Sequence, residues 1–145
     1  MIRLLLILLS FTQLSRGWSY QPEWSSVTPK RVIPHAGGDG AALMRAVEAL
    51  KPGDKLELAA GTYSVERMWD LSISGTREAP IWITAAEGAT VIITRPDAKQ
   101  NVINIGQGSP VAFVCLRGLE FTGGSHGMRL GQCSEVWIDQ CHIHH

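Results

Sequence analysis

An internal repeat constrains the fold of this 145-residue chain more than any other feature of its sequence. Residues 114–123 (VCLRGLEFTG) align with residues 136–145 (VWIDQCHIHH) at an offset of 22 residues. The aligned apolar pairs are Val114 with Val136, Leu116 with Ile138, Leu119 with Cys141, and Phe121 with Ile143. Apolar residues that recur once per turn of a winding chain stack as inward-facing ladders, because each turn buries the face of its neighbour. The repeat therefore predicts a solenoid of short strands.

Two earlier, partial copies indicate the same period. They pair Val91 and Ile93 with Val114 and Leu116 at an offset of 23, and Ile81 and Ile83 with Ile103 and Ile105 at an offset of 22. A β-propeller would need a period of about 40 to 50 residues, and the consensus of the leucine-rich repeat does not occur in this sequence. A Greek-key sandwich of short strands stays open as an alternative.

From residue 56 onward the sequence consists of short apolar alternations separated by turn residues, a pattern typical of an all-β chain. The predicted strands centre on Leu56/Leu58, Ile81/Ile83, Val91/Ile93, Val102/Ile103/Ile105, Val114/Leu116, Leu119/Phe121, Met128/Leu130, Val136/Ile138 and Cys141/Ile143. We therefore expect an all-β fold over this part of the chain.

One short helix is predicted before these strands, within residues 37–63 (GGDGAALMRAVEALKPGDKLELAAGTY). Its apolar residues recur at helical spacing; they are Leu43, Met44, Val47 and Leu50. The sequence Pro-Gly-Asp at 52–54 ends the helix, because proline cannot continue it. A short strand at 56–58 and a turn at 61–63 follow. One helix followed only by strands is typical of a cap over the open end of stacked sheets.

This order of helix, PGD stop, short strand and GTY resembles the N-terminal entry of right-handed parallel β-helix proteins, above all secreted polysaccharide lyases. Residues 74–94, 117–124 (RGLEFTGG) and 134–145 (SEVWIDQCHIHH) resemble successive coils of the alginate lyase and chondroitinase B type, within the pectin-lyase-like superfamily. The resemblance implies an all-β fold, a right-handed parallel β-helix with a short helical cap, and the preference for right-handed parallel connections agrees with it. In those lyases the catalytic Lys and Arg and the calcium-binding acidic residues lie on later coils. The resemblance therefore implies no catalytic residue here, and calcium only for a longer protein.

The first 17 residues predict a secretory signal peptide. Arg3 precedes the apolar run at 4–9, and the small residues Ser15 and Gly17 suit cleavage after Gly17, with cleavage after Ser19 as the second choice. The run is too short for a membrane span, and a retained anchor is the less favoured alternative. We therefore expect a secreted protein, extracellular or periplasmic, with no stable membrane span.

Cleavage would remove Arg3 and Arg16, which leaves 11 of the 13 basic side chains against 13 acidic ones. Because no basic stripe remains, nucleic acid is not an expected partner. Residues 18–34 are expected to form an irregular leader, and 35–145 one β-helix domain made of the cap and the first coils. No polar or helical segment closes the last predicted coil. We therefore expect an N-terminal fragment that is inactive and prone to aggregation on its own.

Two histidines near the end of the chain are the candidate metal ligands. If Ile143 points inward, His142 and His144 point outward on one face of their strand, and two imidazoles spaced in this way suit a transition metal or a general base. The alternative is an ordinary outward polar pair, as Glu120 and Thr122 form one coil earlier. A metal site needs a third ligand, and we expect none from a neighbouring coil of this sequence.

Four outward residues are candidates for binding a polysaccharide: Trp82, Trp137, Arg117 and Arg129. Exposed indoles can stack on sugar rings, although the leader with Trp24 could equally cover them, and we favour the covered arrangement. Cationic side chains would neutralise uronate carboxylates, which is what β-elimination requires. Arg117 aligns with Asp139, however, so a weak surface ion pair between neighbouring coils is the favoured interpretation there.

The remaining reactive side chains have structural interpretations. The three cysteines are an odd count, which argues against a disulfide scaffold. Cys141 is expected in the core and Cys133 in a turn. Cys115 aligns in the repeat with the outward Trp137. A disulfide between Cys133 and Cys141 would need Cα atoms closer than strand geometry is expected to allow. Asp39 is expected to be a turn residue or the N-cap of the helix, with ion binding as the alternative.

Two functions from different classes remain open. One is an enzyme, a polysaccharide lyase or hydrolase that acts on acidic polysaccharide. The other is a non-catalytic β-helix that serves as a surface adhesion or glycan-binding module, since a fold does not by itself determine a function. Convergent charges on one outer face favour the lyase, and an outer face of Thr, Ser and Asn without such charges favours the binding module.

Overall fold

The computed structural model describes residues 20–145, and the predicted signal segment at 1–17 lies outside the described residues. Within this described part the chain is mostly β, with twelve strands, one α-helix (α1, Gly40–Glu48) and one short 3₁₀ helix (η1, Glu23–Ser26). No helix in residues 20–145 is long and apolar enough to cross a membrane.

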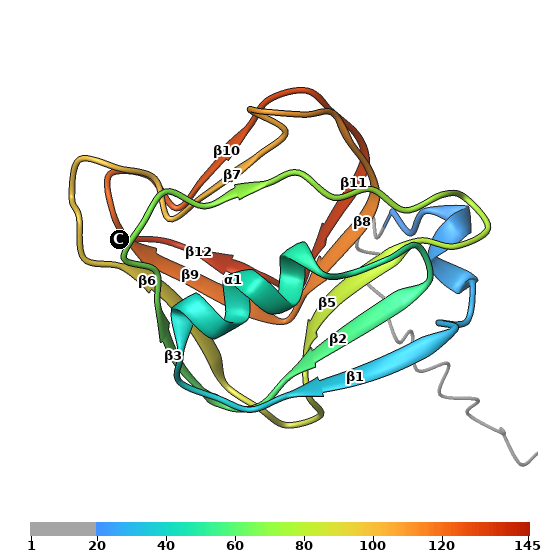
Figure 1. The fold of residues 1–145 in the computed structure, drawn as a ribbon, viewed down its shortest axis with the longest axis horizontal. Helices are drawn as coiled ribbons and strands as arrows, with labels where there is room; N and C mark the ends of the chain where they lie inside the picture. Colours follow the sequence, from blue (N-terminus) through green and yellow to red (C-terminus); the bar gives the residue numbers. More distant parts are fainter. Residues whose placement is uncertain (1–19) are drawn as a thin grey trace, which may run out of the picture.

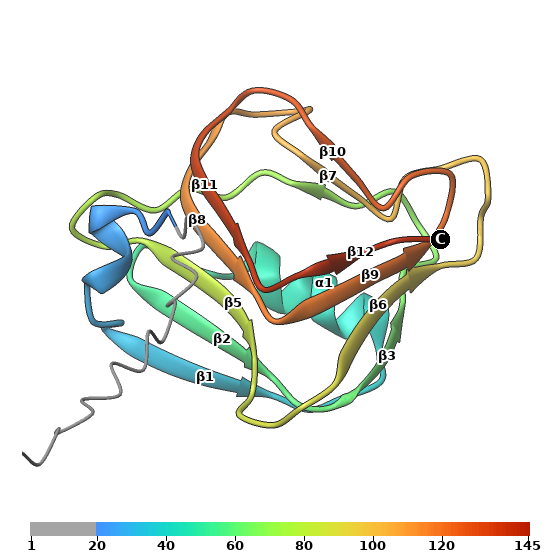
Figure 2. The same cartoon turned by 180° about the vertical axis from the view of Figure 1, so that it is seen from behind.

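The strands form three sheets in which all neighbouring strands are parallel. The first sheet has the order β1 (Arg31–His35), β2 (Asp54–Leu58), β5 (Ile81–Ala85), β8 (Val111–Arg117) and β11 (Cys133–Asp139). The second has the order β3 (Gly61–Ser64), β6 (Val91–Arg95), β9 (Leu119–Gly123) and β12 (His142–Ile143), and the third β4 (Asp70–Leu71), β7 (Ile103–Ile105) and β10 (Met128–Leu130). The chain visits the three sheets in turn and returns to the first (Figures 1 and 2).

Stacked apolar side chains line the interior of each sheet. In the first sheet one register column contains Ile33, Leu56, Ile83, Leu116 and Ile138. In the second, the column contains Tyr63, Ile93, Phe121 and Ile143. In the third, it contains Leu71, Ile105 and Leu130. Side chains alternate between the faces of a strand, so register is fixed wherever one face is buried. The predicted pairs Val114/Val136, Leu116/Ile138 and Phe121/Ile143 are confirmed.

The two partial copies predicted from the sequence are wrong in register. Val91 and Ile93 pair with Leu119 and Phe121, not with Val114 and Leu116. Ile81 and Ile83 pair with Val114 and Leu116, at an offset of 33, not with Ile103 and Ile105. The coil that runs from β5 through β6 and β7 is longer than the coil that follows it, because its connections at 86–90, 96–102 and 106–110 are longer. Loop length is tolerated at little cost in free energy, whereas a shift of register would expose the core.

The helix α1 lies over one end of the space that the three sheets enclose, in front of it in Figure 1 and behind it in Figure 2. The Asp39 carboxylate accepts from the backbone N–H groups of Ala41 and Ala42 at 2.8 and 3.0 Å, so of its two predicted roles, turn residue and N-cap, the N-cap is the one observed. The predicted apolar residues Leu43, Met44, Val47 and Leu50 are buried. Gly40 is required because a Cβ there would overlap the Ser64 carbonyl.

Three local expectations are corrected. The leader is not irregular throughout, because it contains η1 and ends in β1, which pairs with β2. Residues 61–63 do not form a turn but belong to β3, since the buried Tyr63 continues the second column. Cys133 begins β11 and does not lie in a turn. The last strand of each sheet is an edge strand, and on these strands Leu130 and Ile143 are exposed.

Candidate functional site

The two tryptophans predicted on the outer surface lie beneath the leader. Trp82 is only 5% exposed and packs with Trp24 and the buried Cys115, while the partly buried Trp137 packs against the same cluster. Register explains this grouping, because Trp82, Cys115 and Trp137 occupy one column on the outer face of the first sheet. The covered arrangement is therefore the one observed for Trp82, and its indole presents no free face to a sugar in this structure.

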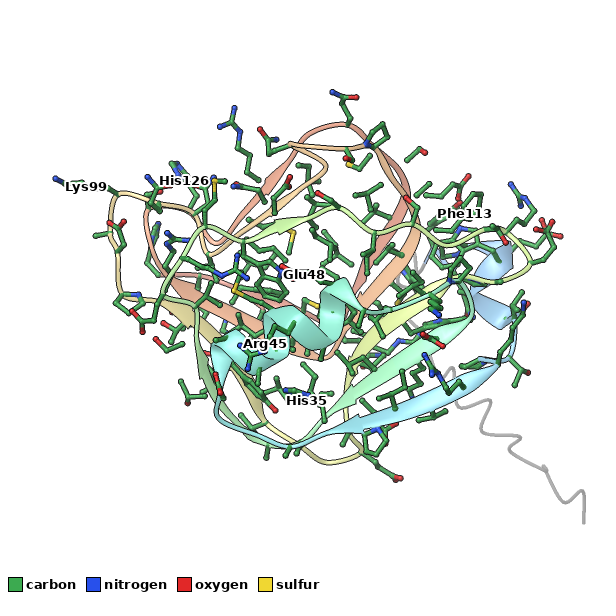
Figure 3. The ribbon with its side chains drawn as sticks, viewed as in Figure 1. His35, Arg45, Glu48, Lys99, Phe113 and His126 are labelled. Carbon is green, nitrogen blue, oxygen red and sulfur yellow. The ribbon has the colours of Figure 1, made fainter. Side chains whose placement is uncertain are left out.

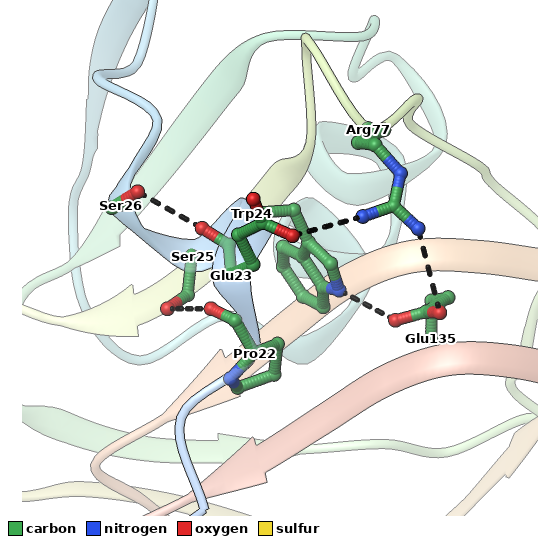
Figure 4. A network of polar contacts seen from close by, with 7 residues as sticks. All are labelled: Pro22, Glu23, Trp24, Ser25, Ser26, Arg77 and Glu135. Atoms are coloured by element: carbon green, nitrogen blue, oxygen red, sulfur yellow. Dashed lines mark hydrogen bonds and ion pairs between the residues drawn. The ribbon is translucent and has the colours of Figure 1, made fainter.

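Polar contacts fasten the leader over this column (Figure 4). The Trp24 indole N–H donates to Glu135 Oε2 at 2.7 Å, and its ring meets that of Trp137 edge-on with centroids 6.4 Å apart. Arg77 lies between Glu23 and Glu135, with N···O distances of 3.8 and 4.0 Å. Pairing a buried indole N–H with a carboxylate removes the penalty of an unsatisfied donor.

Arg117, a third candidate, is already paired. Its Nε donates to Asp139 Oδ2 at 2.8 Å, which confirms the expected ion pair between neighbouring coils, and its guanidinium lies 4.8 Å from the centroid of the Trp137 ring. A cleft of about 240 Å³ beside it is lined by Trp82, Arg117 and Lys55, but Lys55 is also paired, with Glu57 at 2.7 Å. Both cations of this cleft are therefore compensated by carboxylates.

Arg129, the fourth candidate, belongs to a different and larger cleft of about 500 Å³. We name it the Lys99–Arg129 cleft; it is lined by Lys99, Gln100, Asn101, Ser125, His126, Met128 and Arg129. Its lining contains two cations, two amides, a hydroxyl and an imidazole, and no carboxylate. Among the ion pairs of residues 20–145, none involves Lys99 or Arg129.

Two stacked loops, one between β6 and β7 and one between β9 and β10, build the Lys99–Arg129 cleft together with Met128 and Arg129 of β10. Lys99 and His126 lie at the same side of the molecule in Figure 3. The Ser125 N–H donates to the Gln100 carbonyl at 2.8 Å, and the Val102 N–H to the His126 carbonyl at 2.9 Å. These loops approach closely because the residue before Ser125 is Gly124, whose φ is +66° and where a Cβ would lie 2.6 Å from the Gln100 carbonyl oxygen.

Side-chain hydrogen bonds order the floor of this cleft. The Asn101 amide donates to Asn104 Oδ1 at 2.8 Å, and the Ser125 hydroxyl donates to Asn101 Oδ1 at 3.2 Å. A second contact, of 3.3 Å, joins the Ser125 hydroxyl to His126 Nδ1. Such a network holds polar groups in a fixed geometry before any ligand arrives, which reduces the entropy lost on binding.

The structure brings the two candidate metal ligands together with a third residue, Glu120, which the sequence alone places only in an outward polar pair. The rings of His142 and His144 stack with centroids 4.2 Å apart, and His144 Nε2 lies 2.9 Å from Glu120 Oε1. The hydrogen bond to Glu120, and then that to the His145 carbonyl, raise the pKa of His144 above its ordinary value. Glu120, His142 and His144 each offer a ligand atom, and these atoms lie within 4.8 Å of one another.

The three cysteines are free in the structure, so no disulfide joins Cys133 and Cys141. Burial raises the pKa of Cys115 to about 12 and also raises that of Cys141. Cys141 packs against the core, and its thiol donates to the Leu116 carbonyl at 3.4 Å. The burial and raised pKa values of Cys115 and Cys141 are properties of unreactive, structural thiols.

No family model and no curated protein matches the sequence. Among solved structures, the chain is similar to the crystal structure of an alginate lyase from Paenibacillus sp. str. FPU-7, with a TM-score of 0.65 and 24% sequence identity. The match covers 77% of this chain and 36% of that chain, so the chain spans about a third of the protein it resembles. At this identity the likeness concerns the fold, and the parallel sheets described above agree with it.

Proposed function

We propose that this chain forms the first coils of a right-handed parallel β-helix in a secreted protein, and that its Lys99–Arg129 cleft binds acidic polysaccharide. The observation that carries the proposal is the pair of cations in that cleft, neither of which is paired with a carboxylate among the described residues. The likeness to an alginate lyase and the three parallel sheets support the architecture.

The chemistry of the cleft suits a uronate. The guanidinium of Arg129 can donate two parallel hydrogen bonds to one carboxylate, and Lys99 supplies a compact second positive charge. The Gln100 amide can donate to sugar hydroxyls and accept from them, the second N–H of the Asn101 amide can donate, and the Ser125 oxygen can accept. A neutral polysaccharide would satisfy the amides but would leave both cations without a partner. We therefore infer selectivity for charged over neutral polymers.

The favoured reaction of the whole protein is β-elimination. This reaction needs a cation to neutralise the uronate carboxylate and so lower the pKa of the adjacent C–H proton, together with a base that removes it. The Lys99–Arg129 cleft supplies the first requirement. We assign no catalytic base, and the alternative is a glycan-binding module that uses the same cleft without cleaving its ligand.

Calorimetric titration with uronate oligosaccharides, and with neutral oligosaccharides of equal length, tests the proposal. We expect binding of the uronates alone, weakened roughly tenfold or more by Lys99→Ala or Arg129→Ala, because a hydrogen bond to a charged group is worth about 1.5–3 kcal/mol. Arg67→Ala is the matched control, since Arg67 is an exposed arginine paired with Glu48 outside the cleft. Equal binding of neutral oligosaccharides, or unchanged binding by both cleft variants, would contradict the proposal.

A second assay, on the longer protein that contains this chain, distinguishes the lyase from the binding module. Incubation with the uronate polymer, with calcium supplied, is followed at the absorbance of the unsaturated product of elimination. Product formation by the longer protein that contains this chain supports the lyase. Binding without product by that longer protein supports the module.

A further inference from the structure

We propose that Glu120, His142 and His144 form a binding site for a divalent transition metal ion of the zinc type. The site lies on the outer face of the second sheet, at the paired strands β9 and β12. It does not involve the residues of the Lys99–Arg129 cleft, so this inference and the proposed function can fail independently.

The 22-residue repeat creates the site by placing residues of successive coils side by side. Glu120 pairs in register with His142, and Phe121 pairs with Ile143. The His144 N–H donates to the Phe121 carbonyl at 3.0 Å, so the ladder continues to His144. Because side chains alternate along a strand, His142 and His144 share the face opposite to Ile143, and Glu120 lies on that same face.

The ligand atoms lie close enough for rotation of their side chains to bring them around one ion, and the stacked rings of His142 and His144 must tilt for both to face it. Two ligand atoms at about 2.0–2.1 Å from a tetrahedral zinc ion lie about 3.3 Å apart. His144 Nε2 and Glu120 Oε1 are 2.9 Å apart, and all three ligand atoms lie within 4.8 Å of one another. The side chains of Glu120 and His144 are 29% and 36% exposed, so their ends can rotate without disturbing the core.

The donor set selects the class of metal. Two imidazole nitrogens and one carboxylate oxygen suit zinc and its neighbours in the first transition series. Calcium and magnesium prefer ligand sets made of oxygen, so this site differs in kind from the calcium that the family resemblance implies. The metal expected at this site is therefore a transition metal ion, not calcium or magnesium.

A backbone contact orients one of the ligands. His144 Nδ1 lies 2.9 Å from the His145 carbonyl oxygen, which can only accept, so Nδ1–H is the donor. This hydrogen bond directs Nε2 toward Glu120, which is the arrangement that outer-shell partners give to metal-binding histidines. Nε2–H donates to the Glu120 carboxylate at 2.9 Å, and a bound metal ion would take the place of this proton.

The site also has room for an exogenous ligand. Three protein ligands leave the fourth tetrahedral position for water or for a bound molecule. A cleft of about 200 Å³ is lined by Glu120 and His142 together with Thr90 and Gln140. The amide and hydroxyl at this cleft can hydrogen bond to a molecule that approaches the ion.

Metal titration of the tag-free chain tests the inference. We expect one zinc ion per chain by calorimetry, and with Co²⁺ the visible absorption of a four-coordinate complex. His142→Ala, His144→Ala and Glu120→Gln should each weaken zinc binding roughly tenfold or more, because even outer-shell changes cost 10–100-fold. His35→Gln, a histidine on β1, is the control and should bind as the wild type does.

Melting curves protect this test against variants that fail to fold. Zinc should raise the melting temperature of the wild type and of His35→Gln, and leave that of the three site variants unchanged, because a ligand stabilises only the state that binds it. Glu120→Gln keeps the size and polarity of the side chain, so its loss of binding reports the carboxylate. No zinc binding to the folded wild type, or binding as tight in any of the three site variants as in the wild type, would overturn the inference.

Discussion

Arg117 on β8 and Asp139 on β11 occupy the same register position, and the guanidinium Nε donates to the carboxylate at 2.8 Å. The pair joins two successive coils across 22 residues of sequence. The guanidinium also lies over the Trp137 ring, which continues the column beneath the leader. The repeat thus organises the outer surface of the protein as well as its core.

Breaking this pair should have a small effect on stability. The two side chains are 40% and 22% exposed, so solvent screens their attraction, and pairs of this kind contribute about 0–1 kcal/mol. Arg117→Ala should cost more than Asp139→Asn, because it also removes the contact with Trp137. A double-mutant cycle by urea unfolding measures the coupling, and a coupling energy well above about 1 kcal/mol would contradict this assignment.

Removing the indole that fastens the leader should be far more costly. Trp24 is 2% exposed and packs on Trp82, Phe113 and Trp137, so Trp24→Ala should lower the free energy of unfolding by about 3–5 kcal/mol. Glu135→Gln, which keeps the packing of the indole but removes the charge that its N–H and Arg77 contact, should cost much less. Denaturant unfolding measures both, and equal costs would show that the hydrogen bond, rather than the packing of the indole, holds the leader in place.

The thiols should differ in reactivity in the folded protein. Cys115 is fully buried between indoles, and its pKa is raised to about 12, so almost no thiolate forms near neutral pH. The partly exposed Cys133 should therefore be alkylated first, as measured by mass spectrometry of the peptides. Trp24→Ala should accelerate alkylation of Cys115. If Cys115 reacts as fast as Cys133 in the wild type, the leader does not cover this column in solution.

Acid should weaken the fold partly through Asp54. This buried carboxylate accepts from Arg31 at 3.0 and 2.7 Å and from the Lys51 N–H at 2.8 Å, and these contacts hold its pKa below the ordinary value despite desolvation. Because the pKa of Asp54 is lower in the folded than in the unfolded state, its ionisation stabilises the fold fully above the unfolded pKa of about 3.9. This contribution to the free energy of unfolding disappears as the pH falls through the folded pKa.

The comparison that checks this is acid unfolding of the wild type and of Asp54→Asn. The wild type should be the more stable of the two above about pH 5, and the difference between their free energies of unfolding should decrease below about pH 4. A gap that stays constant between about pH 6 and pH 3 would exclude a contribution from the ionisation of Asp54.

The sequence predicts the strands and the last two coils well, because alternation and the 22-residue repeat record directly which side chains face the core. It fails where the coils differ in loop length. The column from Ile83 to Leu116 spans 33 residues, and no pattern in the intervening loops reveals that offset. The strand β1 is not evident in the sequence because Pro34 and the absence of alternation conceal it, although it pairs with β2 as an edge strand.

For the candidate sites as well, the sequence predicts what the strand register determines and misses what the loops form. Register predicts the Arg117–Asp139 pair and the shared face of His142 and His144, and the structure adds Glu120 from the preceding coil. The Lys99–Arg129 cleft is not predicted apart from Arg129, because its residues other than Met128 and Arg129 lie in loops without periodicity. The one signal of it in the sequence is the pair of glycines at 123–124, which permits the close approach of two loops.

An NMR titration of the isotopically labelled chain with a uronate oligosaccharide tests whether the Lys99–Arg129 cleft binds acidic polysaccharide. We expect the largest changes in amide chemical shift on the Lys99–Arg129 cleft, at residues 99–101 and 125–129. Changes centred on Trp137 and Arg117, or the absence of any change at oligosaccharide concentrations in the millimolar range, would contradict this expectation.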